Sequence, residues 1–256
     1  METNNSNESK EIEGSMSESL ASAQENLHFD VVIVGAGSGG VAVSSSLLKR
    51  NGNLRIALVD PATKHYYQPG WTMVGGGVFS AKSTERETHT LLDKRVSQIH
   101  QLVSKVEPDA NSVSLQDGSV VSYHQLVMSP GLTLNWGAIE GLEKTLGKNG
   151  VTSNYRYDLA PYTWELVQKT KHGKAIFTQP PMPIKCAGAP QKALYLSADH
   201  WLKNQCLDNI DIEFCNAGGV LFGVPAYVSG LQSYICLLYT SPSPRDVEEW
   251  GMAGWG

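Results

Sequence analysis

The sequence has few cysteines and lacks both a long apolar run and a block of basic residues. The four cysteines are widely spaced along the 256-residue chain, at Cys186, Cys206, Cys215 and Cys236. This spacing fits neither a zinc site nor a secreted disulfide scaffold, and no metal site is expected. No stretch approaches the roughly 18 consecutive apolar residues of a transmembrane helix. A net charge of −5 without a Lys and Arg cluster argues against nucleic acid as a partner.

The sequence contains enough apolar residues for a folded protein. The hydrophobic fraction is 41%, which suffices for a buried core. The 25 glycines show no Gly-X-Y period, which excludes a collagen-like chain. The composition therefore indicates a soluble or peripheral globular protein, and it favours an enzyme.

The two ends of the sequence differ in composition from the middle. Residues 1–28 are rich in Glu, Ser and Asn, and we expect them to form a disordered acidic tail. They show neither a secretory apolar segment nor an Arg-rich presequence, so no targeting sequence is visible. Residues 236–256 resemble an in-frame translation of a sequencing adaptor, and we interpret them as an artefact; the alternative is a natural Ser/Pro linker.

Between these ends, segments with the composition of strands and helices alternate, which predicts an α/β protein. We expect two Rossmann-like doubly wound domains of the type that binds FAD or NAD(P), the second of them incomplete. Residues 29–149 are expected to form the first, with a β-hairpin insertion, and residues 150–235 the second. In the first domain, strands are expected at 30–34, 55–59, 99–106, 112–116, 119–123 and 126–128, and a helix at 41–50. In the second, helices are expected at 159–171 and 191–204, and strands at 174–178 and 210–215.

A glycine-rich turn follows the first expected strand. Gly35-Ala36-Gly37-Ser38-Gly39-Gly40 satisfies G-x-G-x-x-G between a strand and a helix, and Asp60 ends the next strand. In such a turn Gly35 permits the tight bend, Gly37 lets the backbone approach a pyrophosphate, and Gly40 allows close helix packing. The helix N-terminus attracts phosphate, and Asp60 can accept hydrogen bonds from ribose. The pattern predicts a dinucleotide site.

The motif alone does not distinguish FAD from NAD. A Rossmann unit at the start of the fold, followed by a β-hairpin and a short strand ending in Ser129-Pro130-Gly131, is an order typical of flavoproteins with two dinucleotide sites. In those proteins the first site holds FAD, which is therefore the expected cofactor.

Cys186 lies in a Gly- and Pro-rich loop, next to Lys185 and just before an expected helix. A cation and a helix N-terminus both favour the reactive thiolate, so the pattern favours chemistry over a buried inert cysteine. Cys206 and Cys215 are expected in the core. For His65 we expect a structural role rather than a catalytic one. We expect the aromatic cluster of Tyr66, Tyr67 and Trp71 to pack in the core rather than to line the cofactor site.

Three segments together resemble the sulfide:quinone oxidoreductases of the eukaryotic mitochondrial type. They are Gly35–Gly40, the sequence HYYQP at 65–69 with Trp71 and Thr72, and KCAGAPQK at 185–192. The resemblance extends over about 29–235. It implies a peripheral flavoprotein of the mitochondrial inner membrane that oxidises hydrogen sulfide and passes two electrons through FAD to ubiquinone.

The resemblance also implies roles for single residues. Ser38 and Gly39 would contact the FAD phosphates and Asp60 the ribose. Gln68 would lie near the cofactor, and Val103 would face the adenine. Cys186 would be the first of two redox cysteines, which form a sulfur-bridged pair in the family. Attack by sulfide on this pair would give a persulfide, whose sulfur passes to glutathione or sulfite, and the freed thiolate would form an adduct with the flavin.

The sequence departs from this family in its later part. The partner cysteine, expected in a Gly-Asp-Cys segment, has no counterpart, and neither has the C-terminal membrane-docking region. We therefore expect a C-terminally truncated chain that is inactive alone. Two alternatives stay open: a type II NADH:quinone-like or other pyridine-nucleotide flavoprotein reductase, and an inactive FAD-binding fragment. The former needs a second glycine fingerprint, which Asn216-Ala217-Gly218-Gly219-Val220 does not supply.

Overall fold

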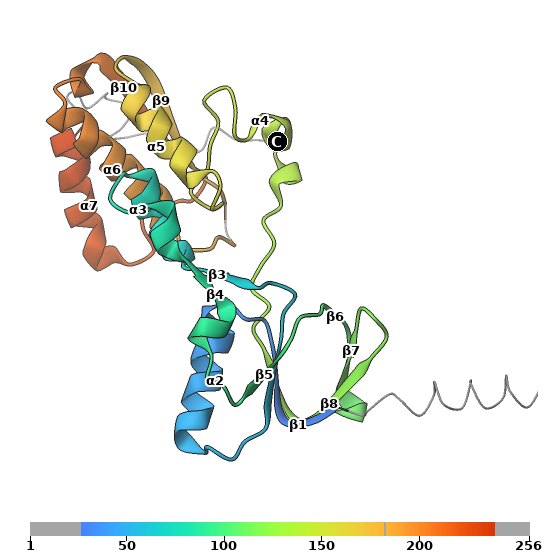
Figure 1. Cartoon of the computed structure of the whole chain (residues 1–256). Coiled ribbons are helices and arrows are strands. Elements are labelled where there is room, and N and C mark those ends of the chain that lie inside the picture. Colours follow the sequence, from blue (N-terminus) through green and yellow to red (C-terminus); the bar gives the residue numbers. More distant parts are fainter. Residues whose placement is uncertain (1–26, 182, 239–256) are drawn as a thin grey trace, which may run out of the picture. The chain divides into compact units, whose positions relative to one another are not determined.

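The computed structural model describes residues 27–181 and 183–238 (Figure 1). The chain divides into two compact units. The first consists of Met1–His65 with Arg86–Thr133, and the second of Tyr66–Glu85 with Leu134–Gly256. The short strands β3 (Lys64–Tyr66) and β4 (Glu85–Glu87) lie where the chain passes from one unit to the other.

The first unit contains a six-stranded sheet with the order β5-β2-β1-β8-β7-β6. Its strands are β1 (Leu27–Val34), β2 (Ile56–Val59), β5 (Val96–Ile99), β6 (Val103–Glu107), β7 (Ser112–Leu115) and β8 (Val120–Met128). The strands β5, β2, β1 and β8 run parallel, and β6, β7 and β8 form an antiparallel meander. Helix α2 (Ser38–Arg50) connects β1 to β2. The expected α/β fold class with a parallel sheet is confirmed.

Strand β1 is buried on both faces, as its continuous β-branched run indicates. Val32 and Val34 belong to one apolar cluster, which also contains side chains of β7 and β8. Val31 and Ile33 belong to a second cluster, to which α2 contributes Leu48. Because successive side chains of a strand point to opposite faces, this one strand joins both halves of the core.

Two expectations about the strands of this unit are wrong. The expected strand 99–106 is two strands, because β5 pairs with β2 and β6 pairs with β7, at opposite edges of the sheet. The expected strands 119–123 and 126–128 are one strand, β8. Its first residues pair with β7, and nearly its whole length pairs with β1. The apolar run 126–128 also predicts a buried strand, but Met128 is 53% exposed.

Strand β1 begins two residues before Phe29, where the first domain was expected to start. Leu27 and His28 belong to β1, where they pair with Val121 and Ser122 of β8. The His28 ring also contacts the Ser122 hydroxyl, with 2.9 Å between Nδ1 and Oγ. The expected tail therefore does not include these two residues, and its remainder at 1–26 lies outside the described residues, as does 239–256 of the expected artefact.

The second unit is built around the parallel strands β9 (Gly173–Gln179) and β10 (Ile210–Asn216). Its helices are α3 (Trp71–Gly75), α4 (Leu142–Thr145), α5 (Ala160–Lys169), α6 (Ala189–Lys203) and α7 (Pro225–Leu238). Trp201 of α6 is 2% exposed, and its indole N–H donates to the Val167 carbonyl of α5 at 2.9 Å. This bond anchors α6, which begins three residues after Cys186.

The prediction that both Cys206 and Cys215 lie in the core is half right. Cys206 is buried beside Trp201, but Cys215 is exposed. Along β10, Ile210 and Ile212 face the core, and Asp211 and Glu213 face solvent. Cys215 shares the register of the two acidic residues, so the alternation of the strand turns it outward.

The division into units differs from the expected boundary between 149 and 150. Residues 66–85 and 134–149 belong to the second unit. The physical reason is a small apolar cluster in which Trp71 and Val74 of α3 pack with Ala160 of α5. In the described part of the chain, no helix has the length and apolarity to cross a membrane, and no three His, Cys, Asp or Glu side chains gather as metal ligands.

Candidate functional site

The glycine-rich turn at the end of β1 packs tightly on one side. Gly35 has a φ of +102°, and a Cβ on it would lie 2.1 Å from the Ser129 carbonyl oxygen. A Cβ on Gly40 would lie 1.9 Å from the Gly35 carbonyl oxygen. Only glycine fits at these two positions, because α2 begins directly against the ends of β1 and β8.

The other side of the same turn is open. No described atom lies within 4 Å of the position that a Cβ on Gly37 would take, and Gly37, Ser38 and Gly39 are exposed. The first turn of α2, described in full, has no side-chain cap on its N–H groups and no acidic residue. Free N–H groups and the partial positive charge of a helix N-terminus attract phosphate. The turn therefore fits the pyrophosphate of a dinucleotide.

Asp60 fixes the turn from the end of β2. Its Oδ2 accepts a hydrogen bond from the Ala36 N–H at 2.7 Å, and its Oδ1 accepts one from the Ala62 N–H at 2.8 Å. A carboxylate has about four acceptor positions, so two backbone bonds leave capacity for ribose hydroxyls. His65 also contacts the turn, with 3.1 Å between Nδ1 and the Ala36 oxygen, as suits the structural role expected for it.

The remaining expected FAD contacts fall in different units. Val103 begins β6 in the first unit and packs, partly buried, against the core of the sheet. Gln68 begins the short 3₁₀ helix η1 (Gln68–Gly70) of the second unit and is half-buried. Their roles toward a cofactor remain predictions.

Cys186 lies in the loop between β9 and α6, and its side chain is exposed. Its backbone has a φ of +56°, a left-handed conformation that is uncommon for a residue with a Cβ. The Cys186 carbonyl accepts the Ala189 N–H at 2.9 Å, at the start of α6. The pKa of the neighbouring Lys185 is lowered by burial, and the adjacent thiol partly opposes that shift.

A tyrosine 31 residues earlier in the chain reaches this loop. The Tyr155 hydroxyl donates to the Lys185 carbonyl at 2.5 Å and lies 3.2 Å from the Cys186 carbonyl oxygen. Burial raises the pKa of Tyr155 to about 12, and the charge of an ionised Cys186 adds to the shift. The phenol is therefore a hydrogen-bond donor throughout the neutral range. No local pattern in the sequence indicates this contact.

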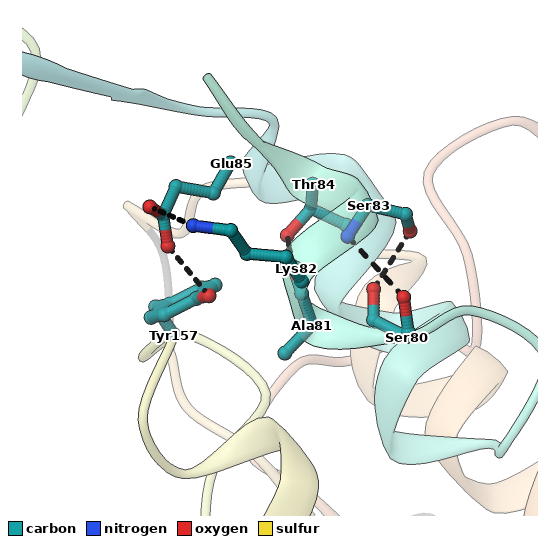
Figure 2. A network of polar contacts seen from close by, with 7 residues as sticks. All are labelled: Ser80, Ala81, Lys82, Ser83, Thr84, Glu85 and Tyr157. Atoms are coloured by element: carbon teal, nitrogen blue, oxygen red, sulfur yellow. Dashed lines mark hydrogen bonds and ion pairs between the residues drawn. The ribbon is translucent and has the colours of Figure 1, made fainter. Parts of the chain in front are cut away.

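Figure 2 shows a polar network that sequence reasoning also missed. The Glu85 side chain is 6% exposed, and its Oε1 contacts the Lys82 ammonium at 2.8 Å. Its Oε2 accepts the Tyr157 hydroxyl at 2.8 Å. Lys82 belongs to the 3₁₀ helix η2 (Ala81–Thr84), and Glu85 follows this helix directly. Glu85 and Tyr157 are 72 residues apart in the sequence. Both carboxylate oxygens of a nearly buried acid are thus satisfied.

Tyr157 of this network also packs against the aromatic rings of Tyr66 and Trp71. The rings of Tyr66 and Tyr157 are 4.6 Å apart between centroids, and those of Trp71 and Tyr157 are 6.2 Å apart. Core packing is therefore the observed role of Tyr66 and Trp71. Tyr67 differs from the expectation, because its side chain is 54% exposed.

Comparison with known proteins identifies the family. Residues 29–165 match the family described as pyridine nucleotide-disulphide oxidoreductase. The chain belongs to this family. Two curated members with which it aligns are mitochondrial sulfide:quinone oxidoreductases. The protein of Dictyostelium discoideum is 43% identical over 201 residues, 77% of this chain and 44% of the relative. That of Mus musculus is 35% identical over 208 residues, 81% of this chain and 46% of the relative.

A solved structure has a similar fold. The sulfide:quinone oxidoreductase of Aquifex aeolicus superposes with a TM-score of 0.67 at 21% identity, over 83% of this chain and 49% of that one. At this identity the likeness supports the fold alone. The resemblance predicted from the three motifs is confirmed by the curated relatives, and the chain spans about half of their length.

The packed side of the turn can be tested by adding one methyl group. We expect Gly40→Ala to lower the free energy of unfolding by about 2 kcal/mol, because the new Cβ collides with the Gly35 carbonyl. Gly37→Ala is the matched control, and its cost is expected to stay below about 1 kcal/mol because its Cβ meets open space. Urea unfolding followed by circular dichroism measures both. Equal losses in the two variants would contradict the packing described.

The state of the Tyr155 phenol can be tested by its absorbance. Because burial disfavours the charged phenolate, Tyr155 ionises only near its pKa of about 12, whereas an ordinary tyrosine is half ionised at pH 10.0. Tyr155→Phe should therefore leave the near-ultraviolet phenolate absorbance of the folded protein at pH 10.0 unchanged. A loss corresponding to half a phenolate per molecule would show that the hydroxyl is not buried.

Proposed function

We propose that this chain is part of a flavoprotein that oxidises hydrogen sulfide and reduces ubiquinone. The observation that carries the proposal is the exposed Cys186 thiol, held in an uncommon backbone conformation directly before α6. The open glycine turn in the first unit supports a dinucleotide cofactor. The names of the two curated relatives support sulfide and quinone as substrates.

The cofactor we propose is FAD. The N–H groups around Gly37, Ser38 and Gly39 would hold its pyrophosphate, with Gly35 and Gly40 shaping the turn. Asp60, whose carboxylate already orients the turn, would bind the ribose. Val103 would face the adenine, and Gln68 would lie near the cofactor. When bound, FAD supplies a two-electron acceptor that passes its electrons to the quinone.

Cys186 is proposed as the thiol that carries the oxidised sulfur. In the net reaction, a thiol and hydrogen sulfide form a persulfide, and a sulfur–sulfur bond replaces two S–H bonds. The two electrons and two protons released reduce the quinone to a quinol. A small acceptor, glutathione or sulfite, then takes the outer sulfur and regenerates the thiol. The thiolate is the nucleophile in such exchanges, so an exposed cysteine suits the role.

The second redox cysteine and the cellular location are also proposals. The partner thiol of Cys186 would come from a Gly-Asp-Cys segment that has no counterpart in this chain. The names of the relatives support a mitochondrial protein. Association with the inner membrane would be peripheral and would use a C-terminal region.

A pyridine-nucleotide reductase is the competing function, and the second unit argues against it. Asn216, the last residue of β10, caps the turn that follows, because its Oδ1 accepts the Gly218 N–H at 2.8 Å. Helix α7 begins only at Pro225, so the strand is not followed directly by a glycine turn and a helix. Such a strand–turn–helix unit is what a second dinucleotide site requires.

The proposal is tested with Cys186→Ser in a full-length protein that includes this chain. The variant should retain FAD, because Cys186 lies outside the glycine turn. The rate of flavin bleaching by sulfide should fall by more than about a thousandfold, as when an enzyme loses its nucleophile. Stopped-flow absorbance measures this rate, and Cys215→Ser, which also removes an exposed thiol, is the matched control.

Two results would count against this function, and a third would count against the expectation that the chain is inactive alone. Bleaching retained in Cys186→Ser would remove this thiol from the reaction. Flavin reduction by NADH but not by sulfide would favour the pyridine-nucleotide reductase. A yellow, sulfide-reducible preparation of residues 1–256 would contradict the expectation that this chain is inactive alone.

A further inference from the structure

The backbone of Cys186 needs support from its surroundings. Its φ of +56° places it in the left-handed region, where the other non-glycine residues of the described chain are Asn111, Asn149 and Gln205. Asparagine adopts this region readily, but a cysteine is strained in it because of its Cβ. A conformation of this kind persists when neighbouring groups fix it. The hydrogen bonds on either side of Cys186 are therefore informative.

Two groups bind the carbonyls of this loop. The Ala189 N–H donates to the Cys186 carbonyl from within the loop. The Tyr155 hydroxyl approaches the Lys185 and Cys186 carbonyl oxygens from another segment, at 2.5 and 3.2 Å. One hydroxyl that lies between two successive carbonyls fixes the peptide plane between them. It thereby restricts the direction in which the Cys186 side chain leaves the backbone.

We propose that Tyr155 is a positioning residue that holds the Cys186 backbone in its left-handed conformation and so orients the thiol for reaction with sulfide. This inference rests on the proposed function. In this role Tyr155 acts through its hydrogen bonds to the Lys185 and Cys186 carbonyl oxygens. Its phenol does not exchange protons in the reaction.

The segment that carries Tyr155 is itself braced. The Tyr155 N–H donates to the Ser153 hydroxyl oxygen at 3.1 Å, which fixes the start of the turn. Two residues later, Tyr157 donates to the buried Glu85 carboxylate in the network of Figure 2. A hydroxyl on a fixed segment can hold a loop in place, whereas one on a mobile segment would move with it. The two tyrosines thus bind different partners from one stretch of chain.

This arrangement provides a matched pair of variants. Tyr155→Phe removes the hydroxyl that reaches the Cys186 loop, and Tyr157→Phe removes the hydroxyl that reaches Glu85. Both keep the aromatic ring, so packing is preserved. The first measurement is amide hydrogen exchange of residues 184–189 in the 256-residue chain. We expect exchange to rise on the order of tenfold in Tyr155→Phe and to remain unchanged in Tyr157→Phe.

The second measurement uses a full-length protein loaded with FAD. At saturating sulfide, the rate of flavin reduction in Tyr155→Phe should fall between about 10-fold and 100-fold, because a misplaced nucleophile slows the reaction rather than weakening substrate binding. The sulfide concentration at half-maximal rate should change by less than about threefold. Tyr157→Phe should retain the rate of the unmodified protein.

The outcomes separate this proposal from the proposed function. Unchanged exchange at 184–189 in Tyr155→Phe would overturn it, and so would equal loss of rate in both variants. A rate loss that vanishes at saturating sulfide would also overturn it, since that would be a binding effect. If the unmodified protein is not reduced by sulfide but the exchange differs as expected, the proposed function fails and the hold of Tyr155 on the loop stands.

Discussion

The backbone contact at the end of β1 is the constraint on which the candidate cofactor site depends. The Ser129 N–H donates to the Val34 carbonyl at 2.8 Å, and the Ser129 hydroxyl donates to the same carbonyl at 3.0 Å. These bonds bring the end of β8 against the turn so closely that Gly35 and Gly40 have no room for a side chain. Helix α2 thereby begins at a turn that is packed at Gly35 and Gly40 and open at Gly37. The packing therefore determines which side of the turn stays open for the proposed phosphate contacts.

The two units hold their candidate functional residues in place by different means. In the first unit, Asp60 accepts backbone N–H groups and leaves the N-terminus of α2 uncapped for an anion. In the second unit, an uncommon backbone conformation lies at Cys186, and the buried Glu85 carboxylate stabilises the tyrosine segment by accepting the Tyr157 hydroxyl. Functional residues placed on loops require rigid surroundings. Hydrogen bonds from distant segments supply that rigidity in both units.

Features with a local cause were predictable from the sequence. The strand, glycine turn and helix at 30–50 follow from a β-branched run and a short motif, and the hairpin at 112–123 follows from Asp117-Gly118. Features that depend on pairing partners were not. The length of β8 is set by β1 and β7 together, and the exposure of Cys215 by the face of β10 that remains uncovered. Contacts such as Tyr155 with Lys185, or Tyr157 with Glu85, join residues 30 to 72 positions apart and leave no local pattern.

The most direct test of the account concerns the open side of the turn. A titration of FAD against the folded chain, followed by quenching of flavin fluorescence, compares the unsubstituted protein with Gly37→Ala. The account predicts that the methyl group occupies the space of the pyrophosphate and weakens FAD binding by more than about tenfold. Equal affinity in the two proteins would contradict it, because the phosphates would then lie somewhere other than at this turn.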